Sequence, residues 1–223
     1  MVSIKSRLLE WHKAWKKELY EYKYLIILSI ILIIFSAGIC FQASTYVDRI
    51  NTVPVPDLIL DNIPALNLGW LYAYGFLAVL TTLTIYTLIF RAKRFHEVAF
   101  LFCLLILVRS IFIMLTHVGI PADAKMDVGI PELYQHSNFR NDLFFSGHAA
   151  MPFLAFLIFR KEKIGMFFLA MSIILSATVL LMHVHYSIDV FSAFFITYGV
   201  YKLGEHIISS RRWNDVINRR KTT

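Results

Sequence analysis

Charged residues are scarce in this sequence, and cysteine is almost absent. Asp, Glu, Lys and Arg together make up 17% of the 223 residues, whereas 58% are hydrophobic. Soluble globular domains carry about 25% charged residues, so an ordinary soluble domain is excluded. The two cysteines, Cys40 and Cys103, lie inside apolar stretches and have no spacing typical of a disulfide framework or a metal site. No internal repeat or low-complexity linker is present, so one domain accounts for the chain.

Long apolar stretches are what the sequence contains instead. A run of about 20 apolar residues is long enough to cross the hydrocarbon core of a membrane as a helix. One of these runs, Ser146 to Phe159, is short, and we expect it to borrow residues from the preceding DLFF at 142–145. The sequence therefore predicts an all-α, polytopic membrane protein built as a bundle of six transmembrane helices. The six stretches are Tyr24 to Ser44, Leu68 to Phe90, His96 to His117, Ser146 to Phe159, Ile164 to His183 and Tyr186 to Glu205.

The distribution of Lys and Arg predicts the orientation of these spans. Eighteen of the 22 basic residues fall on the side that holds both termini, three fall on the other side, and Arg109 lies within the third span. By the positive-inside rule both termini are cytoplasmic, and the loops 45–67 and 118–145 face the other compartment. The membrane is either a bacterial inner membrane or an endomembrane or plasma membrane. The net charge of +7 reflects this asymmetry and attraction to anionic headgroups, and it requires no nucleic acid.

The N-terminal segment is polar and periodic. Its apolar residues recur every three or four positions with lysines between them, which is typical of an amphipathic helix at the membrane interface. A frayed polar leader is the alternative. The first span is too long for a signal peptide and lacks a cleavage site, so we expect it to be retained. We divide the chain into an interfacial helix (1–23), a catalytic transmembrane domain (24–206) and a basic cytoplasmic tail (207–223).

Several polar and ionisable residues occur within or beside the predicted spans. Such residues are costly in a membrane and mark function by default. All of them are expected at the non-cytoplasmic face, although they come from three different stretches of the chain. They are Ser146, Gly147 and His148; His183, His185 and Asp189; and Arg109, Thr116 and His117.

This combination of side chains suits chemistry on a phosphate ester. His185 and Asp189 are four residues apart, so on a helix they share a face, and the carboxylate can fix the imidazole tautomer. The other imidazole nitrogen is then free as a base or nucleophile, while His148 exchanges protons with an oxygen of the substrate. Arg109 can bind two phosphate oxygens. Gly147 permits close backbone approach, and the helix N-terminus from Ser146 offers amides to an anion.

Less specific interpretations of the same residues stay open. His185 and Asp189 could ligate zinc, which a nearby Arg109 disfavours, and we expect no metal or cofactor. His183 could cap the fifth span, and His96, His136 and His206 are typical of interfacial hydrogen-bonding residues. Arg109 could snorkel or pair with an acid in the neighbouring loop. The acids available there are Asp123, Asp127 and Glu132.

The paired motifs resemble a known family. SGH at 146–148, followed one span later by HYSID at 185–189, is similar to the histidine motifs of the type 2 phosphatidic acid phosphatase superfamily. The resemblance implies six spans. It also implies that His185 attacks phosphorus and that His148 acts as acid and base.

Further motifs resemble one branch of that superfamily, the sphingomyelin synthases. VPVPD at 53–57 resembles its first outer-loop motif, and RSIFIMLTHVGIP at 109–121 resembles its arginine segment. Asp142 precedes Ser146 by four residues, as in the branch. The resemblance therefore adds Asp57 and Asp142 to the expected substrate-binding residues. Ile106 and Val108 before the arginine and Ala149 after SGH depart from the branch, and these departures leave the headgroup open.

Missing motifs also bear on the substrate. The lipid phosphatases of the superfamily carry an Arg-Pro motif and a Ser-Arg pair before the nucleophilic histidine. This chain has no Arg-Pro dipeptide, and Thr178 and Val179 stand where the Ser-Arg pair would be. With so few cations a singly charged phosphodiester is better suited than a monophosphate dianion.

The resemblance thus implies a metal-independent lipid phosphotransferase. It would move a phospho-headgroup from a glycerophospholipid to a ceramide-like or diacylglycerol-like hydroxyl through a phosphohistidine, and water as acceptor would give phospholipase C-type hydrolysis. The alternatives are a lipid phosphate or polyprenyl diphosphate phosphatase, or a non-enzymatic transporter or scaffold. The sequence leaves homo-oligomerisation open. The expected catalytic residues are His148, His185 and Asp189, and the expected substrate-binding residues are Arg109, Asp142, Ser146, Gly147 and Asp57.

Overall fold

A computed structural model describes residues 4–126 and 139–210 of the chain. No β-strand occurs in these two segments, which confirms the all-α prediction. A π-helical turn, Leu71–Gly75, leads directly into α2, and short 3₁₀ turns lie at Leu60–Asn62 and Ala92–Arg94. The long helices are α1 (Ile4–Asp48), α2 (Phe76–Phe90), α3 (Phe95–Leu115), α5 (Gly147–Phe159), α6 (Lys163–Leu181) and α7 (Ser187–Ser209).

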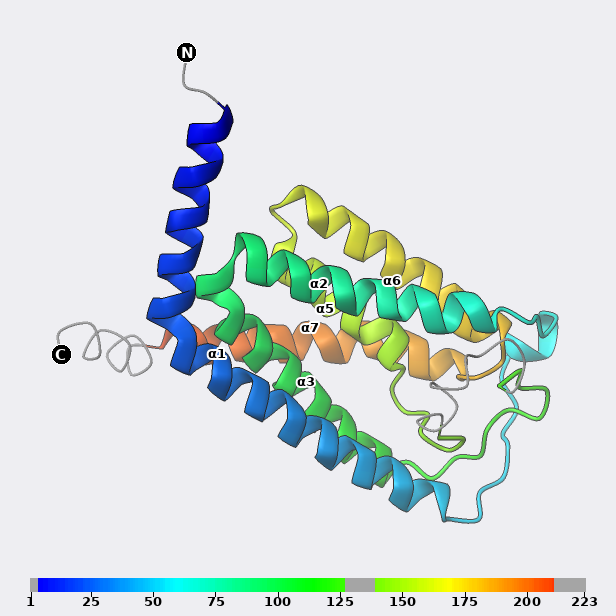
Figure 1. The fold of residues 1–223 in the computed structure, drawn as a ribbon. Helices are drawn as coiled ribbons and strands as arrows, with labels where there is room; N and C mark the ends of the chain where they lie inside the picture. The colour runs from blue at the N-terminus through cyan, green and yellow to red at the C-terminus, as the bar shows by residue number, and fades with distance from the viewer. Residues whose placement is uncertain (1–3, 127–138, 211–223) are drawn as a thin grey trace.

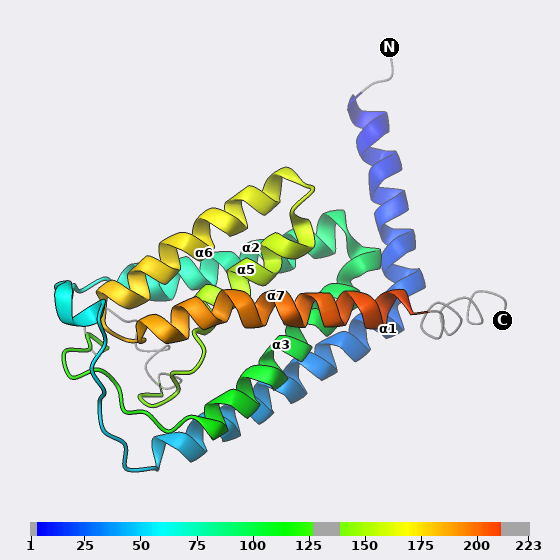
Figure 2. The same cartoon turned by 180° about the vertical axis from the view of Figure 1, so that it is seen from behind.

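The long helices lie side by side in an elongated bundle and alternate in direction (Figure 1). Helix α1 packs along α3, while α5 packs between α6 and α7, as the view from behind also shows (Figure 2). We call the end where α2 leads into α3 the basic end, because its turns carry Arg91, Arg94 and the segment 160–163. The opposite end, where α5 and α7 begin, is the loop end. All of the expected site residues lie toward the loop end (Figure 1).

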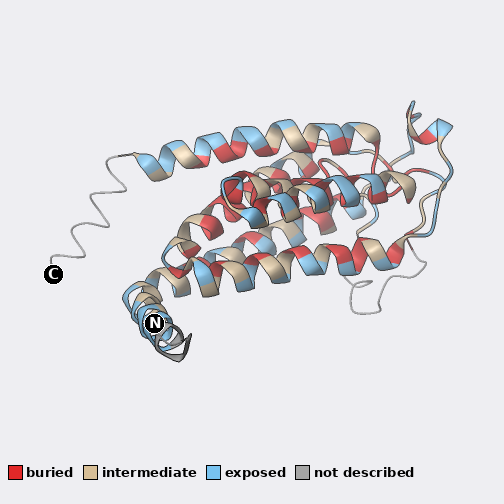
Figure 3. Ribbon diagram, turned by 90° about the horizontal axis from the view of Figure 1, so that it is seen from above, coloured by how far each residue is buried: buried red, intermediate tan, exposed pale blue. Residues whose placement is uncertain are grey.

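The outward faces of the helices are apolar, as expected for contact with lipid. Buried residues line the inside of the bundle and exposed ones its surface (Figure 3). On α7, for example, Phe191 and Phe195 are 53% and 79% exposed. Large apolar patches of this kind on a soluble monomer would be unusual. Among the residues that the structure describes, four helical stretches are long and apolar enough to cross a membrane: Leu9–Asp48, Leu71–Phe90, Ala92–Leu115 and Lys163–Leu181.

These features describe a multi-pass membrane protein. Helix α7, with 23 residues, is longer than two of these stretches, Leu71–Phe90 and Lys163–Leu181, but α5 has only 13 residues. At 1.5 Å per residue α5 is about 20 Å long, which is shorter than a hydrocarbon core of about 30 Å. The six-span count and the cytoplasmic placement of the termini stay predictions.

The start of α5 differs from the sequence-based prediction. We expected the helix to include DLFF, but it begins at Gly147, and the preceding residues are not helical. The physical reason is Arg109, whose Nε donates to the carbonyl of Phe145 at 2.8 Å. Its Nη2 also reaches the carbonyl of Asp142 at 3.4 Å. These two carbonyls therefore accept from a side chain, and the N-terminus of α5 lies inside the bundle.

Helix α1 is one continuous helix across the boundary that the sequence suggested. The expected interfacial segment and the first span join without a break from Ile4 to Asp48. The first part of α1 leans away from the bundle (dark blue in Figure 1). It contacts the basic end, where Trp15 Nε1 donates to the Leu88 carbonyl at 2.9 Å and Tyr22 stacks on His96. The interfacial location of residues 1–23 stays a prediction, and residues 211–223 of the expected tail lie outside the described residues.

Helix α6 ends in a turn that reverses the chain toward α7. The His183 N–H donates to the Leu180 carbonyl and the Val184 N–H donates to the Val179 carbonyl, at 2.9 and 3.1 Å. This pair of bonds is a Schellman motif, in which the residue after the C-cap adopts the left-handed conformation. His183 occupies that position with φ of 55°. His183 thus belongs to the C-terminal capping motif of α6, directly after the C-cap residue Met182, which agrees with one of the two interpretations left open above.

Substitutions at His183 test this role. A β-branched residue is strained in the left-handed conformation by about 1–2 kcal/mol, whereas glycine is not. We expect His183→Val to lower the thermal unfolding midpoint, measured in detergent, more than His183→Gly does, although both remove the imidazole. Equal decreases of the unfolding midpoint in the two variants would show that His183 stabilises the fold through its side chain and not through its backbone conformation.

Candidate active site

His148 lies in the first turn of α5, against the π-helical turn Leu71–Gly75 and the start of α2. Its ring stacks on Tyr72 at 3.9 Å between centroids and tilts against Phe76 at 4.4 Å. The backbone of Tyr72 forms a hydrogen bond with the imidazole, while Nε2 is buried and has no partner. The two aromatic rings and the backbone bond thus fix the imidazole plane and leave one nitrogen available.

His185 and Asp189 meet, but in a different way from the one we predicted. Helix α7 begins at Ser187, so His185 precedes the helix and the two residues do not share a helix face. Asp189 Oδ2 accepts a hydrogen bond from the Tyr186 N–H at 2.9 Å, as in half of a capping box. His185 Nδ1 lies 3.5 Å from the same oxygen. That contact is electrostatic, because its length and direction fall short of a hydrogen bond.

Ser146 joins the two histidine motifs. Its N–H donates to the Asp189 carbonyl at 3.1 Å, which ties the start of α5 to the first turn of α7. His148 in turn lies within electrostatic range of both His185 and Arg109. The structure therefore brings together Ser146, His148, His185 and Asp189, as the motifs predicted.

Three buried polar atoms at this junction have no protein partner. They are Ser146 Oγ, His148 Nε2 and His185 Nδ1, the last with only its 3.5 Å contact to Asp189. Ser146 is fully buried and occupies the N-cap position of α5, yet its hydroxyl does not cap the helix. Unpaired buried polar groups are costly and uncommon. Unpaired buried atoms also occur elsewhere, at His96, Ser176, His183 and Thr197, but a cluster of three at one junction is typical of a site that binds a polar ligand.

Arg109 is buried beside this junction, and its donors are occupied by protein. Besides its bonds to the Phe145 and Asp142 carbonyls, Nη1 donates to Asp142 Oδ2 at 3.2 Å and to Cys40 Sγ at 3.7 Å. Nη2 forms an ion pair with Asp142 Oδ1 at 2.7 Å. A Cβ on Gly147 would lie 3.6 Å from Arg109 Nε, so the glycine lies directly against the guanidinium, and alanine there would shield it without a clash.

The carboxylate partner of Arg109 is therefore Asp142. The sequence allowed pairing with Asp123, Asp127 or Glu132 of the loop 118–145. Asp127 and Glu132 lie outside the described residues. Asp142 belongs to the non-helical segment before α5, which Arg109 holds against α3. The expected contact of Arg109 and Asp142 with substrate stays a prediction.

The sequence analysis missed the contribution of α1. Ser44 Oγ donates to Asp142 Oδ2 at 2.9 Å. Asp48 Oδ1 accepts from the N–H groups of Arg140 and Asn141 at 2.9 and 3.0 Å. The signal was available, because Cys40, Ser44 and Asp48 recur every four residues and therefore share one face of the outer end of α1.

Asp57 holds the start of α7. Its Oδ2 accepts from the N–H and the hydroxyl of Ser187 at 2.7 and 2.8 Å, and its Oδ1 accepts from the N–H groups of Ile59 and Leu60 at 2.9 and 3.1 Å. Burial acts to raise the pKa of Asp57, but the hydrogen bonds from Ser187, Leu60 and Ile59 outweigh it and lower the pKa below its ordinary value of 3.8. With four hydrogen bonds accepted, Asp57 positions the His185 segment, and its expected contact with substrate stays a prediction.

Tyr186 anchors the same segment from its other side. Its hydroxyl donates to the Gly119 carbonyl at 2.8 Å and accepts from the Val55 N–H at 3.0 Å. The Gly119 N–H donates to the Val53 carbonyl, and a Cβ on Gly119 would lie 2.8 Å from the Val53 carbonyl carbon. Glycine is therefore required where the two outer loops cross, and these loops form a scaffold around residues 185–187.

The remaining candidate residues lie apart from the junction. Thr116 is the C-cap of α3, and His117 is exposed with its ring edge toward Tyr46. His96 and His206 lie at the basic end, and His136 is outside the described residues. Within residues 4–126 and 139–210, no group of three or more His, Cys, Asp or Glu side chains is arranged to hold a metal ion.

Comparison with known proteins addresses the same region. Residues 141–207 match the protein-family model described as PAP2 superfamily C-terminal. This region resembles the PAP2 superfamily. The match spans less than half of the chain and includes Ser146, His148, His185 and Asp189, whereas Arg109 and Asp57 lie before it. No curated protein matches the chain. The similarity supports the resemblance to the type 2 phosphatidic acid phosphatase superfamily that the motifs indicated. It also supports an activity of the lipid phosphatase or phosphotransferase type.

Asp57→Asn tests the positioning role of this carboxylate. An amide nitrogen at Oδ2 cannot accept from Ser187, and leaving those donors unpaired costs about 1–3 kcal/mol. We expect a lower unfolding midpoint and a proportionate loss of the enzymatic activity proposed below. Asp123→Asn, which changes an exposed carboxylate of the neighbouring loop, is the matched control and should change neither. An Asp57→Asn protein with unchanged stability would contradict the role.

The lowered pKa of Asp57 predicts a pH dependence of stability. Because the folded-state pKa lies below the unfolded one, the stabilisation is complete above about pH 4 and is lost as the pH falls through the folded-state pKa. Between about pH 5 and about pH 3, the unfolding midpoint of the unmodified protein should fall more steeply than that of Asp57→Asn. Parallel pH profiles for the two proteins would show that Asp57 does not contribute.

Proposed function

We propose that the protein is a membrane lipid phosphotransferase of the sphingomyelin synthase type, which moves a phospho-headgroup from a glycerophospholipid to a lipid hydroxyl. The observation that carries the proposal is the junction of α5 and α7. There two buried histidines lie beside a buried serine hydroxyl and a guanidinium, and His148 Nε2 and Ser146 Oγ have no hydrogen-bond partner.

The first step forms a phosphohistidine. His185 Nε2 attacks the phosphorus of the phosphodiester and forms an N–P bond, while the bond from phosphorus to the diacylglycerol oxygen breaks. The electron pair of that bond goes to the oxygen, which takes a proton from His148 and leaves as diacylglycerol. Asp189, 3.5 Å from Nδ1, stabilises the positive charge that develops on the His185 ring.

The second step transfers the headgroup. His148, now neutral, takes the proton of the acceptor hydroxyl, and the hydroxyl oxygen attacks phosphorus. The N–P bond breaks and its electron pair returns to His185. A ceramide-like or diacylglycerol-like alcohol as acceptor gives a new phospholipid, and water gives a phospholipase C-type product. His148 therefore acts as the acid in the first half-reaction and as the base in the second.

The electrostatics of the site favour a phosphodiester over a monophosphate. Arg109 is the sole buried Lys or Arg among the described residues, and Asp142 already neutralises it. A singly charged phosphodiester oxygen can be stabilised by the outer edge of the guanidinium, by Ser146 Oγ and by amides at the start of α5. A monophosphate dianion would meet a single buried cation, Arg109, whose charge Asp142 already neutralises.

A lipid phosphatase is the second candidate, because the matched region belongs to a superfamily named for phosphatases. It would use the same His185 and His148 steps with a lipid phosphate or polyprenyl diphosphate as donor and water as acceptor. The two candidates differ in their products: the phosphatase releases inorganic phosphate, and the transferase releases diacylglycerol.

The deciding experiment uses purified full-length protein in mixed micelles. Fluorescent ceramide is incubated with choline, ethanolamine, inositol and glycerol phospholipids together, and the products are resolved by mass. We expect a ceramide phospho-headgroup product and stoichiometric diacylglycerol. Release of inorganic phosphate from phosphatidic acid without headgroup transfer would replace the transferase by the phosphatase.

Variants assign the roles of the two histidines. His185→Ala should abolish transfer, and His148→Ala and Asp189→Asn should lower it by about 10²–10⁴-fold. With a headgroup-labelled donor and no acceptor, an acid-labile label should form on the unmodified protein and be absent from His185→Ala. His117→Ala, an exposed histidine at the same end, is the control and should retain full transfer. Transfer that survives in His185→Ala would refute the mechanism.

A further inference from the structure

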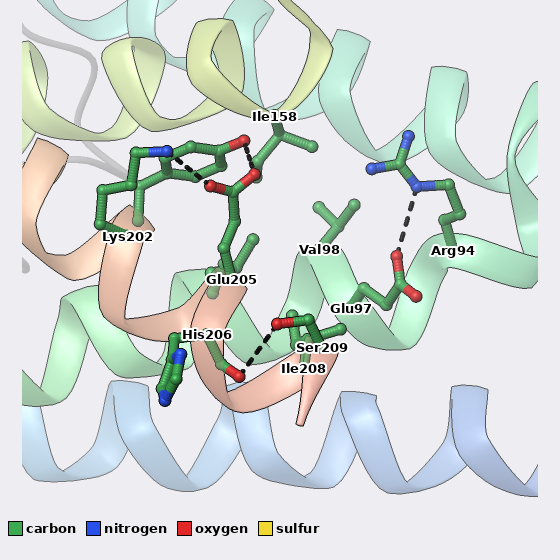
Figure 4. Close-up of a pocket in the computed structure, with 11 residues that line it drawn as sticks. Arg94, Glu97, Val98, Ile158, Lys202, Glu205, His206, Ile208 and Ser209 are labelled. Carbon is green, nitrogen blue, oxygen red and sulfur yellow. Dashed lines mark hydrogen bonds and ion pairs between the residues drawn. The ribbon is translucent and has the colours of Figure 1, made fainter. Parts of the chain in front are cut away.

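A cavity lies at the basic end of the bundle, remote from the α5–α7 junction. It has a volume of about 490 Å³ and lies between the first turns of α3 and the last turns of α7, with Ile158 of α5 beside it (Figure 4). This volume is within the range of about 300–1,000 Å³ that is typical of small-ligand sites. Neither the histidine motifs nor the proposed reaction uses this cavity.

The cavity has two charged walls, one on each helix. On α3 and the turn before it, Arg94 Nε lies 3.3 Å from Glu97 Oε2. On α7, Lys202 Nζ lies 3.0 Å from Glu205 Oε2, and the Tyr201 hydroxyl donates to the other oxygen of Glu205. Figure 4 shows the two pairs facing the cavity from opposite sides. Each ion pair therefore stays within its own wall.

The charges of the lining balance. Two cations and two carboxylates line the cavity, and all four side chains are between 32% and 47% exposed. Arg94 also has a longer contact, 4.0 Å, with Glu162 outside the lining. An anionic ligand would gain from the cations but would be repelled by two carboxylates. A ligand with one phosphate and one ammonium group could contact both kinds of charge, because each of its groups meets an opposite charge in either wall.

The apolar part of the lining consists of Val98, Leu101, Ile158 and Ile208. Tyr201, His206 and Ser209 of α7 complete the lining and add polar atoms to it. The apolar side chains can receive the glycerol backbone and the first methylenes of acyl chains, and the exposed apolar faces of α3 and α7 continue away from them. The basic end is also where Lys and Arg gather, as at the headgroup level of a membrane.

We propose that this cavity, formed by Arg94, Glu97, Lys202 and Glu205 over an apolar floor, binds the headgroup of a zwitterionic phospholipid. The phosphate lies between Arg94 and Lys202, and the ammonium lies between Glu97 and Glu205. Bound there, the lipid bridges α3 to α7, the helices that carry Arg109 and Asp189 toward their other ends. It stabilises the folded bundle without taking part in the reaction, so the inference is independent of the proposed function.

Thermal unfolding tests the site. Purified full-length protein in a nonionic detergent is titrated with phosphatidylethanolamine, phosphatidylcholine or phosphatidylglycerol of the same acyl chains. A ligand that binds only the folded state raises the unfolding midpoint. We expect the zwitterionic lipids to raise it at lower concentrations than phosphatidylglycerol does. A lower half-effect concentration for one zwitterion identifies ethanolamine or choline as the preferred headgroup.

Charge substitutions separate this site from the active site. Arg94→Gln with Lys202→Gln should raise the half-effect concentration of the zwitterionic lipid at least tenfold. Arg94→Lys with Lys202→Arg should restore it, which excludes misfolding as the cause. Glu97→Gln with Glu205→Gln should reverse the preference toward phosphatidylglycerol. Lys163→Gln, an exposed cation at the same end outside the cavity, should have no effect.

Two results would overturn the proposal. One is a midpoint shift that persists unchanged in Arg94→Gln with Lys202→Gln. The other is a shift that disappears when Ser146→Phe fills the active site, because the bound lipid would then be the substrate. Loss of headgroup transfer in His185→Ala with the midpoint shift intact would leave this proposal standing whatever the reaction is.

Discussion

A guanidinium inside an apolar helix bundle must have its hydrogen-bond donors satisfied, and this requirement organises the loop end of the molecule. Arg109 meets it with Asp142, the Phe145 carbonyl and Cys40. The segment before α5 is thereby held in a non-helical path, and α5 begins at Gly147 inside the bundle. A buried ion pair of this kind contributes little net stability, because desolvation offsets most of its attraction. Its effect here is on geometry, since it fixes where the amides, the serine and the first histidine lie.

The two histidine motifs approach each other through backbone bonds that no spacing in the sequence reveals. Ser146 donates to the Asp189 carbonyl, Asp189 accepts from Tyr186, and Asp57 accepts from Ser187. Each of these bonds satisfies a group at the start of a helix, where amides lack intrahelical partners. The precision of the junction thus derives from ordinary helix capping, supplied by residues from separate loops.

Much of the fold and part of the site were predictable from the sequence, for identifiable reasons. Apolar runs and their polar boundaries located most helix ends to within a few residues, because a membrane-facing helix must be apolar over its whole length. The start of α1 was not located in this way, because the helix continues without a break into the polar N-terminal segment. His148, His185 and Asp189 stood out as candidates because ionisable residues are rare in or beside such helices. The roles of Asp57 and Asp142 were harder to predict. Whether an acid contacts a ligand or a backbone amide depends on loop paths, and local propensity does not determine them. Cys40, Ser44 and Asp48 were missed because a face that packs on another helix looks, in sequence, like any polar interruption of a span.

The connection between α6 and α7 has one further consequence. Only five residues, 182–186, separate the two helices, and the left-handed His183 sets the direction in which they leave α6. If α6 ended one residue later, its last Cα would be rotated by about 100° and the whole reversal would face another way. The imidazole of His185 is thus oriented by the length of the preceding helix. Insertions or deletions in the outer half of α6 should therefore be tolerated far less well than substitutions on its lipid-facing side.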